Sequence, residues 1–165
     1  MSDINAYCGA CGNRFTPDQA WPRHCAVCGS TIYRNPLPVA VVLLPVTSGV
    51  VVIRRNTEPM RGTLTLPGGY IDYGETWQGA ARRELHEETG ILLPEGEIRL
   101  YDVQNGLDNT LVIFGLASAQ PDAVVKPYCS AETAEVVIIT KPETLGFTMH
   151  TGVVARYFEE RTRNK

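Results

Sequence analysis

The stretch Gly69–Ile91, GYIDYGETWQGAARRELHEETGI, limits what this chain can be more than any other. Its second half is rich in strong helix formers, and Thr76 and Gly90 suit the N-cap and the residue that ends a helix. We therefore expect a helix at about 76–89. Three glutamates follow one another on it at i, i+3 and i+4, which places them on one face within an arc of about 100°. They are Glu84, Glu87 and Glu88.

A cluster of carboxylates on one side of a buried helix is costly unless a positive charge compensates it. A hard divalent metal, which prefers oxygen ligands, is the natural compensator. The alternative is a solvated acidic helix face, because glutamate-rich helices are common, and three glutamates alone would favour it. The residues around the glutamates decide between these two interpretations.

Nine positions of the stretch carry the residue types of the Nudix box, G-x5-E-x7-R-E-U-x-E-E-x-G-U, in which U is apolar. The chain therefore resembles the Nudix hydrolases, and the box covers 23 of its 165 residues. The resemblance implies an α/β fold, the α/β/α sandwich with a mixed sheet. The nine positions are Gly69, Glu75, Arg83, Glu84, Leu85, Glu87, Glu88, Gly90 and Ile91.

The segment 1–35 differs from the rest, because it holds four of the five cysteines in two Cys-x-x-Cys pairs. A glycine follows each pair, as the tight turn of a zinc knuckle requires. Such pairs in a short polar segment indicate one structural Zn²⁺ held by four thiolates, so we predict a zinc ribbon. Two disulfides are the alternative, but nothing in the sequence suggests export to an oxidising compartment. The four ligands would be Cys8, Cys11, Cys25 and Cys28.

The segment Arg34–Pro38 contains two prolines and is expected to be stiff and extended. We place the domain boundary there, with the zinc ribbon at 1–35 and the Nudix domain at 36–165. Alternation and apolar runs predict the remaining elements of the second domain. Strands are expected at 39–46, 50–54, 64–66, 98–104, 110–117 and 136–140, and a last helix near 150–163. We expect His150 to be an ordinary residue at the start of that helix.

The net charge of −3 and the pI of about 5.6 give no sign of a nucleic-acid binder. The N-terminal residues lack the apolar run of a secretion signal, and the longest apolar run is too short to span a bilayer. We therefore expect a cytoplasmic protein with no membrane partner. The family resemblance is also compatible with a homodimer.

The pairing of a zinc ribbon with a Nudix box resembles one branch of the family, the zinc-ribbon Nudix hydrolases. That branch includes NADH pyrophosphatases and relatives that act on FAD or ADP-ribose. The NADH enzymes carry a Ser-Gln-Pro-Trp-Trp-like signature after the box. Residues 101–114 contain neither the proline nor the tryptophans. We therefore predict a small nucleotide substrate of the ADP-ribose or FAD type.

The resemblance implies that Mg²⁺ or Mn²⁺ neutralises the phosphates and activates water, held by Glu84, Glu87 and Glu88. A carbonyl oxygen of Gly69 could add a further ligand. Arg83 and Glu75 are expected to pair and brace the loop against the helix. The base that takes the proton from water stays open between a glutamate of the box and one of a later loop. The loop candidates are Glu132 and Glu135.

Three other functions remain open beside the hydrolysis of ADP-ribose or FAD. One is an NAD(H) pyrophosphatase, and another is a Nudix enzyme directed at RNA caps. The third is a regulator that senses a nucleotide without cleaving it. The intact box argues against the regulator, and the acidic pI argues against an RNA-directed enzyme.

Overall fold

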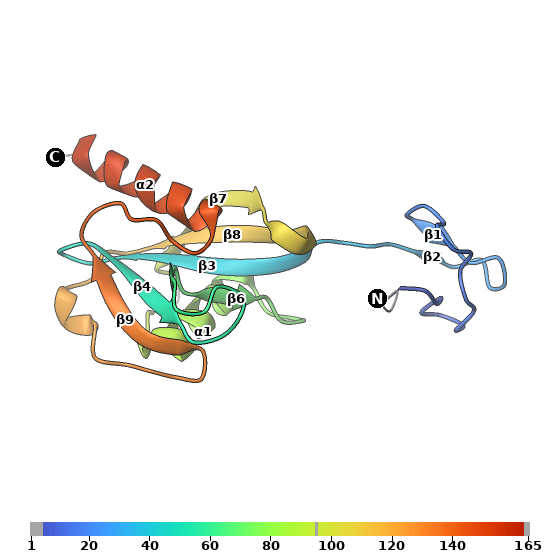
Figure 1. Cartoon of the computed structure of the whole chain (residues 1–165), viewed down its shortest axis with the longest axis horizontal. Helices are drawn as coiled ribbons and strands as arrows, with labels where there is room; N and C mark the ends of the chain where they lie inside the picture. The colour runs from blue at the N-terminus through green and yellow to red at the C-terminus, as the bar shows by residue number, and fades with distance from the viewer. Residues whose placement is uncertain (1–4, 95, 164–165) are drawn as a thin grey trace. The chain divides into compact units, whose positions relative to one another are not determined.

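The structure is a computed structural model, and it describes residues 5–94 and 96–163. The chain forms two compact units whose boundary lies between Pro36 and Leu37 (Figure 1). Neither of the two α-helices among the described residues combines the length and apolar character that crossing a membrane requires.

The first unit is built around two tight turns and one short hairpin. The hairpin pairs β1 (Arg23–His24) with β2 (Thr31–Ile32) in antiparallel fashion. In each turn a glycine amide donates back to the cysteine carbonyl four residues earlier, from Gly12 at 2.8 Å and from Gly29 at 2.9 Å. Both glycines have φ near +70°, a conformation that other residues rarely adopt. The small core consists of Cys8, Phe15, Cys25 and the partly buried Ile32.

The second unit contains one mixed sheet with the strand order β5-β4-β3-β8-β7. In addition, β6 pairs with β3, and β9 pairs with β4. The β3–β8 pair is parallel and the other pairs are antiparallel. The strands are β3 (Leu37–Pro45), β4 (Val50–Arg55), β5 (Leu64–Thr65), β6 (Gly68–Tyr70), β7 (Ile98–Asn105), β8 (Thr110–Ala117) and β9 (Thr133–Ile139). Two short 3-10 turns, Leu107–Asn109 and Asp122–Val124, lie in the connections.

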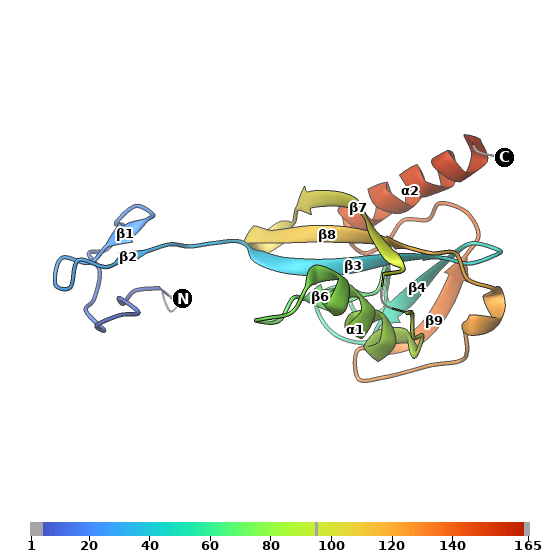
Figure 2. The ribbon, with the colours of Figure 1, turned by 180° about the vertical axis from the view of Figure 1, so that it is seen from behind.

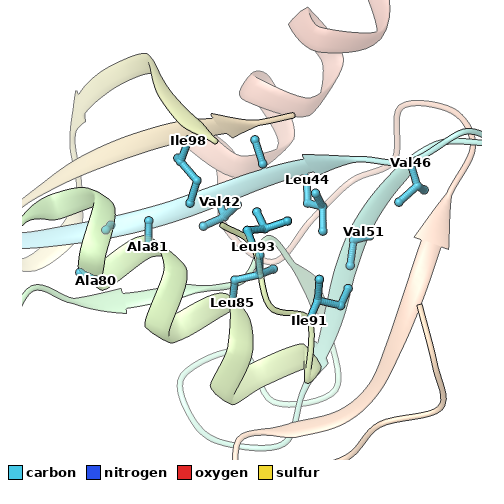
Figure 3. Close-up of a cluster of buried hydrophobic side chains, with 12 residues drawn as sticks. Val42, Leu44, Val46, Val51, Ala80, Ala81, Leu85, Ile91, Leu93 and Ile98 are labelled. Carbon is cyan, nitrogen blue, oxygen red and sulfur yellow. The ribbon is translucent and has the colours of Figure 1, made fainter. Parts of the chain in front are cut away.

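Two helices cover opposite faces of this sheet, as Figures 1 and 2 show. Helix α1 (Trp77–Thr89) packs on the face that presents Val42 and Leu44 of β3 (Figure 3). Helix α2 (Thr148–Arg163) packs on the face that presents Val41 and Leu43. Strand β3 is buried on both faces, which explains its nearly continuous apolar sequence. The expected α/β/α sandwich with a mixed sheet is confirmed.

The structure places α1 where the sequence predicts a helix. The Thr76 hydroxyl accepts a hydrogen bond from the amide of Gly79 at 3.0 Å, and the φ of Gly90 is +72° at the other end. Strand β6 was not predicted, and among the predicted strands the largest difference concerns β9, which begins at Thr133 rather than at 136. Its antiparallel register with β4 continues to the pair Arg55↔Thr133, so pairing across the sheet extends the strand.

Strand β3 changes its antiparallel partner along its length, and this change positions the site. Residues 39–41 pair with β6, whereas Leu44 and Pro45 pair with β4. Strands β6 and β4 therefore occupy successive stretches of the same edge of β3, opposite β8, and diverge between residues 41 and 44. The loops and helix ends that surround this divergence carry the polar residues described next.

Candidate active site

A cavity of about 890 Å³ lies at this divergence. Its lining comes from β3, the loop after β4, β6, α1, the segment before β9 and the start of α2. One part of the wall is apolar, including Val41, Leu66, Val112 and Phe147. Carboxylates line another part: Glu58, Asp72, Glu84, Glu87, Glu88 and Glu132. A smaller cavity of about 320 Å³ near Tyr157 contains a single carboxylate, Glu97, in its lining.

Arg83 organises the entrance to the cavity. Its guanidinium donates to both carboxylate oxygens of Glu75, at 3.1 and 3.0 Å, and to the carbonyl of Tyr70 at 3.0 Å. It also reaches Glu84 at 2.7 Å and Glu87 at 3.2 Å. These hydrogen bonds from Arg83 lower the pKa of the Glu75 carboxyl. The structure thus pairs Arg83 with Glu75 and ties the loop before α1 to the helix.

Glu88 is the most buried carboxylate of the site, with 3% of its surface exposed. One of its oxygens accepts a hydrogen bond from the amide of Gly68 at 2.8 Å. Burial nevertheless raises the pKa of Glu88 to about 8, and the negative charges of Glu84 and Glu132 add to this rise. The positive charge of Arg55 opposes this rise but does not outweigh it.

Glu84 is also buried, at 9% exposed, and burial raises its pKa even though Arg83 opposes the shift. Glu87 is exposed, so it lies at the edge of the cavity nearest to solvent. His86 is exposed as well. The three glutamates of the helix therefore differ in depth, with Glu88 deepest and Glu87 outermost.

Glycine at position 69 is required by the close approach of β6 to α1. A Cβ atom there would overlap the carboxylate of Glu84, because all three atoms of that group lie within 3 Å of its position. At Gly68 a Cβ atom would overlap the carbonyl oxygen of Ala40. The two glycines thus let the backbone run directly against the acidic cluster. The proposed metal contact of the Gly69 carbonyl stays a prediction.

The structure separates the two later glutamates. Glu132 lines the cavity, and its charge acts on both Glu84 and Glu88. Its backbone is fixed by the amide of Asn56, which donates to the Glu132 carbonyl at 2.8 Å. Glu135 lies outside the cavity lining and pairs with Arg54 at 2.6 Å. Glu132 is therefore brought to the glutamates of the helix, and Glu135 is not.

The oxygen-rich cluster fits a hard divalent cation. Glu84, Glu88 and Glu132 offer carboxylate oxygens in a partly buried place, which is the ligand type that such ions prefer. Among the described residues these carboxylates form no group as compact as the cysteines do, and Arg83 and the amide of Gly68 donate hydrogen bonds to Glu84 and Glu88. A bound cation would favour the ionised form of Glu88, whose pKa is raised by burial and by the charges of Glu84 and Glu132.

Sequence reasoning assigned no role to several cavity residues. His150 is 6% exposed, and its Nδ1 accepts a hydrogen bond from the amide of Leu66 at 3.2 Å. Burial, with the positive charge of Arg55 as a second cause, lowers the pKa of His150 to about 3. The sequence predicted an ordinary residue at the start of a helix. It could not predict the buried hydrogen bond with Leu66, which joins residues 84 positions apart. Arg55 and Phe147 line the same cavity.

The four N-terminal cysteines form a second polar cluster. All four sulfurs lie within 4.8 Å of one another, with Cys8–Cys28 at 3.7 Å and Cys11–Cys25 at 3.6 Å. A tetrahedron of sulfurs around Zn²⁺, with Zn–S distances of about 2.3 Å, has edges of about 3.8 Å. No disulfide joins these cysteines. The arrangement fits one Zn²⁺ with four thiolate ligands.

Comparison with known families decides the relationship of this chain. The model of the NUDIX domain matches residues 34–157, which is most of the chain. The chain belongs to the Nudix family. Nudix enzymes use divalent metals, in agreement with the oxygen-rich cluster around Glu88. The family's box coincides with α1 and the loop before it.

Individual relatives of this Nudix protein differ in how much they share with it. The NAD-capped RNA hydrolase NudC of Escherichia coli K12 is 30% identical over 86 residues, or 52% of this chain. The match covers 33% of NudC, so the chain spans about a third of the curated relatives that it matches. Among solved structures, a NUDIX hydrolase from Nitrosomonas europaea has a TM-score of 0.77 and 24% identity, covering 97% of this chain and 94% of that one.

A second solved structure shares the same fold at lower coverage. It is the bifunctional NMN adenylyltransferase/ADP ribose pyrophosphatase from Francisella tularensis, complexed with AMP and a manganese ion. Its TM-score is 0.66 at 21% identity, and the match covers 78% of this chain and 42% of that one. At this identity the likeness establishes the common fold.

Proposed function

We propose that this Nudix protein hydrolyses the phosphoanhydride of a nucleoside diphosphate linked to another group, such as ADP-ribose or FAD. The products would be a nucleoside monophosphate and the phosphorylated remainder. The observation that carries the proposal is the single cavity that joins the acidic cluster of Glu84, Glu88 and Glu132 to an apolar wall. A diphosphate would lie at the carboxylates while the groups at its ends contact the apolar surface.

In the proposed reaction the carboxylates and the arginine of the cavity have separate roles. Glu84, Glu87 and Glu88 would hold Mg²⁺ or Mn²⁺, which when bound neutralises phosphate charge and activates water. Arg83 keeps two of these carboxylates in place through its contacts at 2.7 and 3.2 Å. Glu132 would take the proton of the attacking water. The water oxygen then bonds to phosphorus, and the bridging oxygen leaves with the other phosphate.

Glu132 is favoured as the proton acceptor by its position. It faces Glu84 and Glu88 in the cavity, whereas Glu135 is engaged with Arg54 outside it. Among the described residues, the Glu132 carboxylate has no hydrogen bond or ion pair that would occupy its oxygens. A proton acceptor needs a free oxygen within reach of the attacking water. A glutamate of the box stays the alternative base.

The similarity to NudC supports a second candidate function, the hydrolysis of NAD or of an NAD cap on RNA. The cavity itself would accept the NAD diphosphate by the same chemistry. The missing signature in residues 101–114 and the net charge of −3 favour the smaller ADP-ribose and FAD substrates. The proposal includes a cytoplasmic location, a homodimeric assembly and one structural Zn²⁺ at the four cysteines.

A substrate panel with Mg²⁺ or Mn²⁺ tests the proposal. It should contain ADP-ribose, FAD, NADH, NAD, NAD-capped RNA, diadenosine polyphosphates and nucleoside triphosphates, with products identified by mass. We expect the highest kcat/KM for ADP-ribose or FAD, with AMP among the products. If NADH, NAD-capped RNA or a triphosphate exceeds both by about tenfold, or ~1.4 kcal/mol, the substrate assignment is wrong. Failure to cleave any anhydride would refute the reaction class.

A further inference from the structure

Arg55 is a cavity residue whose charge the proposed chemistry does not use. It is the last residue of β4, and the register with β9 shifts between Arg54 and Arg55. Successive side chains of a strand point to opposite faces of the sheet. Arg55 accordingly lines the cavity, while the neighbouring Arg54 does not.

The hydrogen bonds of Arg55 leave its positive charge unpaired. Its Nε donates to the carbonyl oxygen of Pro59 at 2.8 Å, and one terminal nitrogen donates to the hydroxyl of Thr57 at 3.4 Å. Both acceptors are neutral. Within the described part of the chain, Arg55 has no carboxylate partner, and its other terminal nitrogen has no hydrogen bond.

The other cation in the lining, Arg83, differs in this respect. It contacts the carboxylates of Glu75, Glu84 and Glu87, so its donors are used. Arg55 therefore supplies the positive charge of the lining that remains available to a ligand. The partial burial of this charge without an anionic partner costs desolvation free energy, which an anionic ligand would offset.

The guanidinium of Arg55 is also oriented by its surroundings. Its carbon lies 5.7 Å from the centre of the Phe147 ring, and the Pro59 carbonyl fixes its Nε edge. This packing leaves for a ligand the terminal nitrogen without a hydrogen bond and the second N–H of the one that contacts Thr57. Parallel donors of this kind match the oxygens of a phosphate in bidentate geometry. The positive charge of Arg55 acts on Glu88 as well, which places both groups in one electrostatic environment.

We propose that Arg55 is a substrate-binding residue whose guanidinium binds the phosphate oxygens that the glutamate-held cation does not contact. In this arrangement the diphosphate lies between the acidic cluster and Arg55. The cation would compensate the negative charge of the cluster, and the diphosphate would compensate the positive charge of Arg55. The inference rests on the proposed function in taking the ligand to be a diphosphate. The test below uses a diphosphate without a nucleoside, so it does not depend on which nucleotide is cleaved.

The probe is imidodiphosphate, which resists hydrolysis, and its binding to the full-length protein with Mg²⁺ is measured by calorimetry. We expect Arg55→Gln to weaken binding at least about tenfold, because hydrogen bonds to charged groups contribute about 1.5–3 kcal/mol. Arg54→Gln is the matched control, since Arg54 also donates to the loop after β4, to the Gly62 carbonyl at 2.9 Å. We expect the control to change affinity less than twofold.

Arg55→Lys keeps the charge but loses the paired donors, so its affinity should lie between those of the wild type and Arg55→Gln. Thermal unfolding of each variant establishes that the second unit is folded, and Arg55→Lys serves the test if Arg55→Gln is not. Equal affinity of wild type and a folded Arg55 variant would overturn the proposal. So would an equal loss in Arg54→Gln, which would mean that both arginines act through the loop. The substrate panel tests the proposed function, and the binding data test the role of Arg55, so each proposal can fail without the other.

Discussion

At the scale of single residues, the contact between Gly69 and Glu84 is the most demanding one in the site. The backbone at Gly69 passes so close to the Glu84 carboxylate that no side chain fits between them. Any methyl group there must push the carboxylate away from its contact with Arg83. The position of Glu84, a proposed metal ligand, thus depends on the absence of a side chain on the neighbouring strand.

Gly69→Ala should therefore lower kcat/KM by about 100-fold, since a shift of about 1 Å at a reacting centre has an effect of this size. The fold should survive, because the three atoms nearest to the new methyl group belong to the far end of the flexible Glu84 side chain. Steady-state kinetics and circular dichroism measure the two effects. Gly152→Ala is the control, as a Cβ atom there meets nothing within 4 Å. Wild-type activity in Gly69→Ala would show that Glu84 has no fixed role.

The buried imidazole of His150 should make the stability of the protein depend on pH. Its folded pKa of about 3 lies below the unfolded value of 6.5, so it is neutral in the folded state and gains a proton on unfolding in acid. The contribution of the neutral, buried His150 to the free energy of unfolding is complete above pH 6.5 and declines as the pH falls toward 3. We expect this contribution to the free energy of unfolding to be about 2 kcal/mol smaller at pH 5 than at pH 7. Arg55 is the charged group that acts on it.

Denaturant unfolding of the wild type and His150→Gln at pH 5 and pH 7 isolates this term. The stability difference between the two proteins should shrink by about 2 kcal/mol at pH 5, because the variant has no group to protonate. Glu88, whose pKa is raised, contributes in the opposite sense between about pH 4.5 and pH 8 in both proteins. Comparison of the two proteins cancels that contribution. A difference that is the same at both pH values would contradict a neutral buried His150.

At the scale of elements, helix α1 depends on local signals at its two ends. Thr76 caps the first turn through its hydroxyl, and Gly90 ends the helix in a left-handed conformation. Thr76→Ala should destabilise the second unit by about 1 kcal/mol, and Thr76→Asn should restore most of the loss. Thermal unfolding monitored by circular dichroism measures both. An unchanged midpoint in Thr76→Ala would show that the cap contributes little here.

These local signals explain why α1 and its glutamates could be predicted from the sequence. Helical spacing fixes Glu84, Glu87 and Glu88 on one face without reference to the rest of the chain. Likewise, the two Cys-x-x-Cys pairs predict a compact sulfur cluster, which the first unit forms. The strands with long apolar runs also lie near their predicted ranges.

Other parts of the site depend on contacts that spacing along the chain does not encode. The choice between Glu132 and Glu135 required the register of β4 with β9, which pairs Arg54 with Glu135. Arg55 lines the cavity from the end of β4, where its partner in β9 is Thr133. His150 reaches the site through its hydrogen bond to Leu66, across 84 residues of sequence. Such long-range pairing could not be derived from periodicity.

At the scale of the whole molecule, the two units have separate cores and should differ in what stabilises them. The first unit has a core of few side chains, so most of its folding free energy would come from the metal. The second unit has two extensive cores, one on each face of its sheet. We therefore expect the loss of zinc to affect the first unit and to leave the Nudix fold intact.

Elemental analysis of the purified protein should find about one zinc per chain, since four thiolates complete one tetrahedral site. Cys25→Ser should abolish binding, because Cys25 is a buried member of the cluster. Hydrogen exchange should then show loss of protection in residues 5–36 and unchanged protection in the second unit. A protein without zinc whose cysteines are paired in disulfides would refute the zinc ribbon.

The most direct test of the proposed hydrolase is turnover of ADP-ribose and FAD by Glu88→Gln, compared with the wild type in saturating Mg²⁺. Glutamine keeps the size of Glu88 and can still accept the hydrogen bond from Gly68, but it removes the charge that a cation needs. Glu135→Gln, which alters a carboxylate outside the cavity, is the control. We predict that Glu88→Gln stays folded and loses at least about 100-fold in kcat, or ~2.7 kcal/mol of transition-state stabilisation, while Glu135→Gln stays within about threefold of the wild type. A folded Glu88→Gln protein with wild-type turnover would contradict metal-dependent hydrolysis at this site.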